Sequence, residues 1–300
     1  MSSEDLHGET RQGEIVFDDG FPPPTSETLR AMSGRPVYRP RKTLPLLLFV
    51  ATCVSTWFAG GWVFSLALMF TLLAHEFGHY LQAVRYGVPA SLPFFIPMPI
   101  SPIGTMGAVI AMQPGKGDRK ELYDIAISGP LAGFFPAVVF SIIGLQLSEV
   151  QPIPENQLLL MFGEPLFYQW LVQLTFGTIP DGHDVILHPL AFAGWVGLFI
   201  TALNLFPIGQ LDGGHILYAL VGKHAHLVAR LFVIGAIAGV LLGGYYGWSV
   251  MLTLLLLMGI NHPPTANDDV PLGTTRTVLG WIALAFMPLG FTPTPFSISG

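Results

Sequence analysis

Residues 66–86 have the sequence LALMFTLLAHEFGHYLQAVRY, and this stretch decides how the rest of the chain is interpreted. It is apolar over most of its length, as a membrane-spanning helix must be. His75, Glu76 and His79 nevertheless lie within it. A carboxylate in lipid costs about 3 kcal/mol unless it is paired or faces a polar cavity. The stretch therefore predicts a membrane helix that carries functional side chains.

The composition of the whole chain also indicates a membrane protein. Only 11% of the 300 residues are charged, against about 25% in an ordinary soluble domain. Hydrophobic residues make up 51%, the net charge is -6, and there is one cysteine. These values exclude a disordered chain, a disulfide scaffold and a nucleic-acid-binding protein. We expect the lipid bilayer, and no nucleic acid, as a partner.

Long runs without Asp, Glu, Lys or Arg set the fold class. A spanning helix needs about 20 predominantly apolar residues. From these runs we expect an all-α polytopic membrane protein with six to seven transmembrane helices. The expected spans lie near residues 45–64, 66–86, 123–146, 188–208, 227–244, 246–261 and 277–294. A tight turn at residues 243–247 precedes the short sixth span, and the last span lies either across the membrane or in its interface.

The positions of Lys and Arg predict the orientation, because cytoplasmic loops are enriched in them. Arg35, Arg39, Arg41 and Lys42 precede the first span, so we expect a cytoplasmic N-terminus. Residues 1–43 are expected to form a flexible cytoplasmic tail, and residues 44–300 the membrane domain. Residues 147–187, which contain no Lys or Arg, are expected to form an extracytoplasmic loop. The N-terminal segment is unlike a transit peptide, which favours a bacterial inner membrane.

The two histidines in the second span have the spacing of metal ligands. Residues four apart share one face of a helix, so His75 and His79 can bind one metal ion. Glu76 lies beside the first of them and can act as a general base toward water. The alternative is that His75 pairs with a neighbouring helix while Glu76 marks the membrane edge.

A third ligand is needed, because a catalytic zinc ion usually has three protein ligands. The best candidate is Asp212, in the sequence NLFPIGQLDGGH of residues 204–215. Pro207 and the glycines are expected to loosen the helix there, and broken helix in a membrane is tolerated where it lines a polar cavity. The alternative is a helix C-terminus followed by ordinary loop residues.

These motifs together resemble the site-2 protease family of intramembrane zinc metalloproteases. The resemblance rests on His75-Glu76-x-x-His79 and on Asn204-x-x-Pro207-x-x-x-Leu211-Asp212-Gly213-Gly214. Gly104-Thr105-Met106-Gly107-Ala108 and Gly129-Pro130-x-x-Gly133 agree with it. It covers residues 44–262 and is similar to the branch of the ethylene-dependent gravitropism-deficient and yellow-green proteins. The chain departs from the pattern at His215, where Arg is frequent, and lacks an inserted PDZ domain.

The resemblance implies a role for each matching residue. His75, His79 and Asp212 are implied to bind one Zn²⁺ per chain, which makes residues 44–300 a transmembrane metalloprotease domain. Glu76 is implied to be the general base and then the acid. Asn204 either donates a hydrogen bond to the substrate carbonyl or oxyanion, or forms a buried bond between helices. His215 is a partner of the ligands, a pH-sensitive gate, or a loop histidine at the membrane edge.

Residues 91–112 are expected to form a re-entrant loop or β-hairpin beside the active site. Pro93, Pro97, Pro99 and Pro102 exclude an ordinary spanning helix. The edge of such a hairpin can pair with an unwound substrate by strand addition. The alternative is a proline-rich connector packed on the helices.

The expected function is hydrolysis of peptide bonds in or near the transmembrane helix of a membrane-protein substrate. Two other functions fit parts of the pattern. Ionisable residues and broken helices also occur in ion-coupled transporters. A catalytically inactive membrane chaperone of the same fold is the other alternative, although it has no need to keep Glu76. The sequence leaves the oligomeric state open.

Overall fold

A computed structural model describes residues 43–112, 115–153 and 159–299. The expected tail, residues 1–43, lies outside these ranges except for Thr43. Most of the described residues are helical. The helices are α2 (Thr43–Arg85), α3 (Arg119–Gln146), α4 (Leu166–Phe176), α5 (Pro189–Asn204), α6 (Asp212–Val221), α7 (Ala225–Leu242), α8 (Ser249–Met258) and α9 (Thr274–Gly290), with short 3-10 turns η1 (Gly222–His224) and η2 (Tyr246–Trp248). The strands are β1 (Phe94–Pro97), β2 (Thr105–Val109), β3 (Glu149–Pro152), β4 (Leu159–Phe162), β5 (His183–Ile186) and β6 (Phe296–Ser299).

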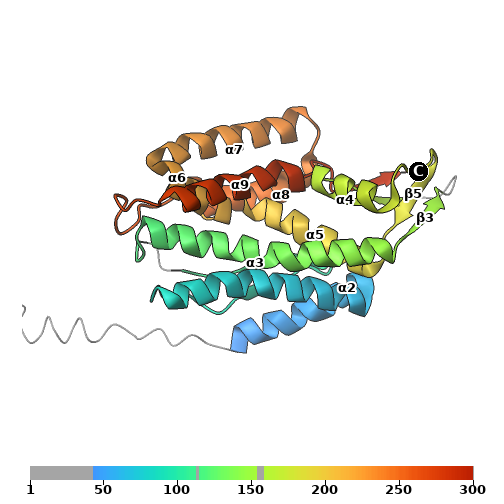
Figure 1. Ribbon diagram of the computed structural model, residues 1–300, viewed down its shortest axis with the longest axis horizontal. Coiled ribbons are helices and arrows are strands. Elements are labelled where there is room, and N and C mark those ends of the chain that lie inside the picture. The colour runs from blue at the N-terminus through green and yellow to red at the C-terminus, as the bar shows by residue number, and fades with distance from the viewer. Residues whose placement is uncertain (1–42, 113–114, 154–158, 300) are drawn as a thin grey trace, which may run out of the picture. The chain divides into compact units, whose positions relative to one another are not determined.

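Helix α2 consists of two arms that turn back on each other at Gly61. Gly61 has a φ of 81°, which glycine adopts without the steric cost of a side chain. The Ser65 hydroxyl donates to the carbonyl of Cys53 over 3.0 Å, whereas twelve residues of straight helix would rise about 18 Å. The two arms run in opposite directions in Figure 1. They correspond to the expected spans 45–64 and 66–86, with the boundary at Gly61.

Helix α3 lies between the second arm of α2 and helix α5 (Figure 1). Glycines at both contacts let the backbones approach closely. A Cβ atom at Gly78 of α2 would lie 2.5 Å from the carbonyl oxygen of Ser128 in α3. A Cβ atom at Gly144 of α3 would lie 2.1 Å from the backbone nitrogen of Ala191 in α5. These contacts fix the two helices that carry most of the site against α3.

Among the described residues, three helical stretches are long and apolar enough to cross a membrane. They are Thr43–Arg85, Arg119–Gln146 and Asp212–Leu242, the last of which joins α6, η1 and α7. The apolar helices Pro189–Asn204 and Tyr246–Met258 are shorter, because the chain leaves helical geometry before the expected ends at residues 208 and 261. The described residues thus form a mostly helical chain with three candidate spans, and six to seven spans stay a prediction.

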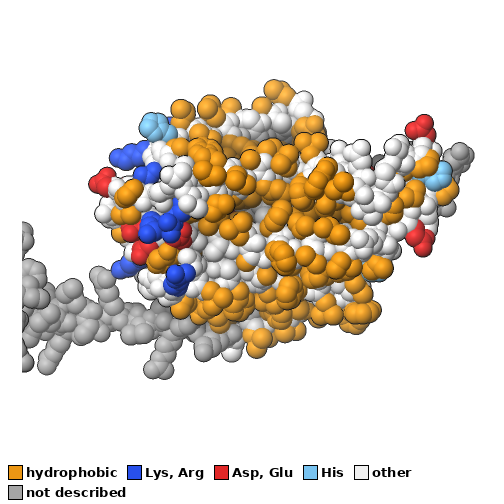
Figure 2. All heavy atoms as spheres, in the orientation of Figure 1, with side chains coloured by type: hydrophobic (Ala, Val, Ile, Leu, Met, Phe, Trp, Pro, Cys, Tyr) orange, Lys and Arg blue, Asp and Glu red, His pale blue; other side chains and the backbone are white. Residues whose placement is uncertain are grey.

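The outward-facing side chains are hydrophobic over the middle of the molecule. Phe58, Leu242 and Leu257 are each about 80% exposed or more. Figure 2 shows hydrophobic side chains covering the middle of the visible face, with the Lys and Arg side chains gathered at one end. Acidic side chains and histidine mark the other end of that face. Such a surface is unfavourable in water and suits a lipid environment.

Residues 91–112 contain the expected antiparallel hairpin, formed by β1 and β2. Phe94 pairs with Val109 and Phe95 with Ala108. The Ser55 hydroxyl of α2 donates to the carbonyl of Gly104 over 2.6 Å and anchors the turn. A Cβ atom at Gly104 would lie 2.7 Å from the carbonyl oxygen of Ser55, so this approach requires glycine.

Two further connecting segments, the turn at residues 243–247 and the expected loop of residues 147–187, also have defined structure. The expected turn at residues 243–247 is present, since α7 ends at Leu242 and α8 begins at Ser249. Within the expected loop of residues 147–187, β3 pairs with β5 and helix α4 lies between β4 and β5 in the chain. Strand β4 pairs with β6 near the C-terminal end of the sequence. Residues 154–158 of this loop are outside the described residues.

Candidate metal centre

The break between α5 and α6 places Asp212 at the start of a helix. Helix α5 ends at Asn204, and α6 begins at Asp212. Between them Pro207 and Gly209, with a φ of 44°, lie outside helical structure. The expected loosening therefore occurs at residues 205–211. It does not extend to Gly213, which lies inside α6.

Gly213 has a packing role in the first turn of α6. A Cβ atom there would lie 2.0 Å from the carbonyl oxygen of Leu205. The glycine thus allows the first turn of α6 to rest on the broken segment. The expectation that this residue loosens a helix is wrong, and the alternative of a helix C-terminus at Asp212 is also wrong, because α6 starts there.

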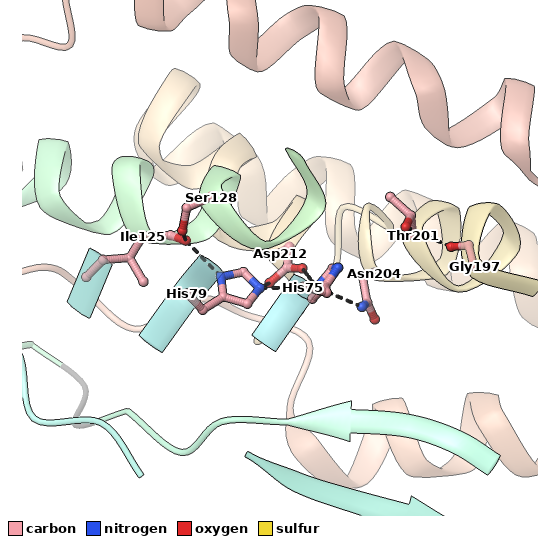
Figure 3. Close-up of polar contacts among 8 residues, drawn as sticks. All are labelled: His75, His79, Ile125, Ser128, Gly197, Thr201, Asn204 and Asp212. Carbon is pink, nitrogen blue, oxygen red and sulfur yellow. Dashed lines mark hydrogen bonds and ion pairs between the residues drawn. The ribbon is translucent and has the colours of Figure 1, made fainter. Parts of the chain in front are cut away.

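His75, His79 and Asp212 converge on one point (Figure 3). Nε2 of His75 lies 3.1 Å from Oδ2 of Asp212, and Nε2 of His79 lies 3.2 Å from Oδ1. The two Nε2 atoms are 3.2 Å apart. His75 and His79 come from neighbouring turns of α2, and Asp212 comes from the start of α6. Each offers one ligand atom, and these atoms lie within 4.8 Å of one another. Two imidazole nitrogens and a carboxylate form a donor set that zinc prefers.

The ring of His79 is oriented by α3. Its Nδ1 lies 2.8 Å from the carbonyl oxygen of Ile125, to which it can only donate. The proton therefore sits on Nδ1, and Nε2 keeps a free lone pair toward His75 and Asp212. A backbone carbonyl in this position is the common outer partner of metal-binding histidines.

Glycines of α3 provide the room for both imidazoles. A Cβ atom at Gly129 would lie 2.0 Å from Nε2 of His79. A Cβ atom at Gly133 would lie 3.0 Å from Nδ1 of His75. Residues four apart share a face of a helix, so the two glycines form one recess opposite His75 and His79.

Glu76 and Asn204 lie at the same cavity. Glu76 is 3% exposed, and it lines a cavity of about 430 Å³ together with the three converging residues. The side-chain amide of Asn204 lies 3.3 Å from Nε2 of His75. The structure thus brings together the expected metal ligands, the expected base and Asn204 at one cavity.

The hairpin and a C-terminal segment both line this cavity. Phe94 and residues 108–112 contribute from the hairpin. Residues 259–269, here called the strap, follow α8 and contribute His262 and Thr265. The strap is fixed at its start, where the Gly209 N–H donates to the carbonyl of Ile260 over 2.9 Å. At its far end the Arg119 N–H donates to the carbonyl of Asn267 over 3.0 Å.

The sequence interpretation missed two features of the site. His215 is buried in α6 and lies 2.6 Å from His262 of the strap, measured between Nδ1 and Nε2. It is therefore not a loop histidine. Asp124 of α3 accepts two hydrogen bonds from Arg276 of α9 at 2.7 and 3.0 Å, which ties α9 to the end of α3 near the site. Neither contact has a local signal in the sequence.

The second arm of α2 ends close to these residues. His79 lies six residues before Arg85, the last residue of the helix. At 1.5 Å per residue this corresponds to about 9 Å of helix. The site is thus near one end of the apolar region and far from the acidic segment of residues 147–187.

Comparison with known proteins places the site within a recognised domain. A model of peptidase family M50 matches residues 63–242. The probable chloroplastic zinc metalloprotease EGY1 of Arabidopsis thaliana is 34% identical over 227 residues, which cover 74% of this chain and 41% of the relative. Its counterpart EGY2 from the same plant is 29% identical over 239 residues, 79% of this chain and 42% of the relative. This chain thus spans about two fifths of the length of these relatives.

Proposed function

Because the chain belongs to peptidase family M50, we propose that it is an intramembrane zinc metalloprotease. It hydrolyses peptide bonds in or near the transmembrane segment of membrane-protein substrates. The observation that carries this proposal is the meeting of His75, His79, Asp212 and Glu76 at one cavity. The transporter and the inactive chaperone are not favoured, because the family is that of peptidases and Glu76 is present beside the ligand set.

In this proposal His75, His79 and Asp212 hold one Zn²⁺ per chain. The tautomer of His79 and the recess at Gly129 both support it, because they leave Nε2 of His79 free toward the other two residues. When bound, zinc supplies a Lewis acid that polarises a peptide carbonyl and lowers the pKa of water to near 7.

Glu76 acts as the general base and then as the acid in the proposed reaction. Its carboxylate accepts a proton from the attacking water and delivers it to the leaving amine. Its burial supports this role, since bulk water is kept from competing for the proton. The Asn204 amide, at the same cavity, donates a hydrogen bond to the substrate carbonyl or oxyanion.

The proposed membrane arrangement extends beyond the three candidate spans. We propose six to seven spans, a cytoplasmic N-terminal tail of residues 1–43, a metalloprotease domain of residues 44–300 and an extracytoplasmic loop of residues 147–187. The gathering of Lys and Arg at one end of the face in Figure 2 supports this orientation. The named relatives are chloroplast proteins, so the bacterial inner membrane stays a prediction.

The substrate is proposed to bind as an extended segment beside the hairpin. A helix hides its peptide bonds, so cleavage requires local unwinding. Strand β2 and the residues after it line the cavity, and an unwound segment can pair with such an edge. In this proposal the hairpin is a re-entrant element at the depth of the site.

Metal content measured on detergent-purified protein tests the proposal without knowledge of the substrate. We expect near one zinc per chain in the unaltered protein and a clear loss in His75→Ala and Asp212→Asn. His183→Ala, in β5, is the matched control for nonspecific binding and is expected to keep the zinc. Unchanged zinc in Asp212→Asn would show that the site is wrong as drawn, because the two distant motifs would then not share one ion.

A further inference from the structure

His215 and His262 form a pair of imidazoles on the wall of the cavity. Nδ1 of His215 lies 2.6 Å from Nε2 of His262. The residues are 8% and 7% exposed, and both line the cavity that holds Asp212 and Glu76. Tyr218 stacks on the His262 ring with centroids 4.4 Å apart, so the ring is held in place.

The second nitrogen of His262 decides where the protons of this pair lie. Nδ1 of His262 is buried and has no hydrogen-bond partner among the described residues. Burial lowers the pKa of His262 to about 3, so the ring is neutral near pH 7 and carries one N–H. A buried N–H without a partner is rarer than an under-satisfied acceptor. The tautomer with the proton on Nε2, donated to Nδ1 of His215, leaves no buried N–H of His262 without a partner.

This assignment fixes the ring of His215. Because its Nδ1 accepts a hydrogen bond, the single proton of the neutral ring sits on Nε2. His215 lies three residues after Asp212, on the same side of α6. His215 lines the cavity, and with Nδ1 occupied by His262, Nε2–H is its remaining hydrogen-bond donor.

We propose that His215 contacts the substrate by donating an Nε2–H hydrogen bond to a carbonyl oxygen of the bound peptide, and that His262 positions it by fixing the tautomer. This inference rests on the proposed function. A donor aimed at a carbonyl on which negative charge develops stabilises the transition state. It also explains why a histidine pair is placed beside the ligand set without contributing a ligand.

Substitutions that keep one nitrogen position at a time test the proposal. The amide of Gln reaches the position of Nε2, whereas that of Asn reaches only the position of Nδ1. With fluorescein-labelled casein as the probe in detergent, His215→Gln is expected to keep kcat/KM within about 10-fold. His215→Asn and His215→Leu are expected to lose about 100-fold, the range found when an oxyanion donor is removed. Zinc content is expected to stay near one per chain in all three variants.

The comparison of Gln with Asn substitutions also tests His262. A spectroscopic measurement tests the tautomer of His215 independently of activity. His262→Gln keeps a donor toward His215 and is expected to be more active than His262→Asn. Nitrogen NMR of histidine-labelled protein, assigned with His215→Gln, is expected to show a protonated Nε2 in His215.

Three results would overturn the inference. They are a proton on Nδ1 of His215, greater activity of His215→Asn than of His215→Gln, or zinc loss in all His215 variants. No cleavage by the unaltered, zinc-loaded protein would count instead against the proposed function. The NMR result would still decide the tautomer.

Discussion

A side-chain carbon at position 129 would lie 2.0 Å from Nε2 of His79, the nitrogen that faces Asp212. Glycine at this position is therefore a requirement of the proposed metal site, although it contributes no ligand atom. The ring of His79 cannot move aside freely, because its Nδ1 is bonded to the carbonyl of Ile125.

Gly129→Ala is accordingly expected to lose most of the bound zinc, because the added methyl displaces Nε2 from the ligand position. Metal analysis of purified protein checks this. Gly235→Ala, in α7, is the matched control, since a Cβ atom there meets nothing within 4 Å. Full zinc occupancy in Gly129→Ala would show that the recess is not needed.

Glu76→Gln is expected to abolish cleavage while zinc content stays near one per chain. The amide has nearly the same shape as the carboxylate but cannot accept the proton from water. A general base contributes about 10²–10⁴-fold to a rate, so loss of at least 100-fold in kcat is the expected result. Cleavage at an unaltered rate would remove Glu76 from the mechanism.

Asn204→Ala distinguishes the two roles that the sequence left open. If the amide contacts the substrate, kcat/KM is expected to fall about 100-fold with little change in thermal stability. Its amide nitrogen lies 3.3 Å from Nε2 of His75, at the cavity that both residues line. A lower melting temperature with unchanged kcat/KM would instead assign it to a bond between α5 and α2.

The hydrogen bonds of Asp268 in the strap lead us to expect that the thermal stability of the protein depends on pH. Its carboxylate accepts hydrogen bonds from the hydroxyls of Thr265 and Tyr218 at 2.6 and 2.8 Å, and these bonds lower its pKa. The stability that it contributes is present above its unfolded pKa of about 3.9 and is lost as the pH falls through the lower folded value. We expect Asp268→Asn to lower the melting temperature at pH 7 by a few degrees.

The effect of Asp268→Asn is expected to shrink as the pH falls below the unfolded pKa of about 3.9 and through the lower folded pKa of this carboxyl group. Thermal unfolding in detergent across this range measures it. Asp269→Asn, at an exposed neighbour, is the control. A difference that persists unchanged at low pH would mean that the charge of Asp268 does not stabilise the strap.

The sequence predicted those parts of the site that depend on helix geometry. The spacing of His75 and His79 was sufficient to predict that the two imidazoles lie on the same side of their helix, because residues four apart share a face. Asp212 could be inferred as the third ligand candidate, because it is a charged residue beside an apolar run at a point where proline and glycine interrupt the helix. The hairpin was predicted because prolines exclude a helix at residues 91–112.

Other features depend on tertiary contacts and have no local signal. The contact of His215 with His262 depends on the path of the strap across α6, and 47 residues separate them in the chain. Gly129 could be noted as part of a motif, but its contact with His79 requires the distance between α2 and α3. The end of α5 at Asn204 and the turn at Gly61, where φ is 81°, likewise fall where local backbone conformation, rather than apolar content, sets the limit.

The short stretch of helix between His79 and Arg85 has a consequence for the fate of the product. If a substrate helix is cut at the depth of the site, the piece on the Arg85 side retains about six residues of its apolar segment. That is far below the roughly 20 needed to span the bilayer. Such a fragment would have too little apolar length to remain anchored and would leave the membrane, whereas the remainder would keep most of the apolar segment. The depth of His79 in α2 would thus determine which half of a substrate becomes soluble.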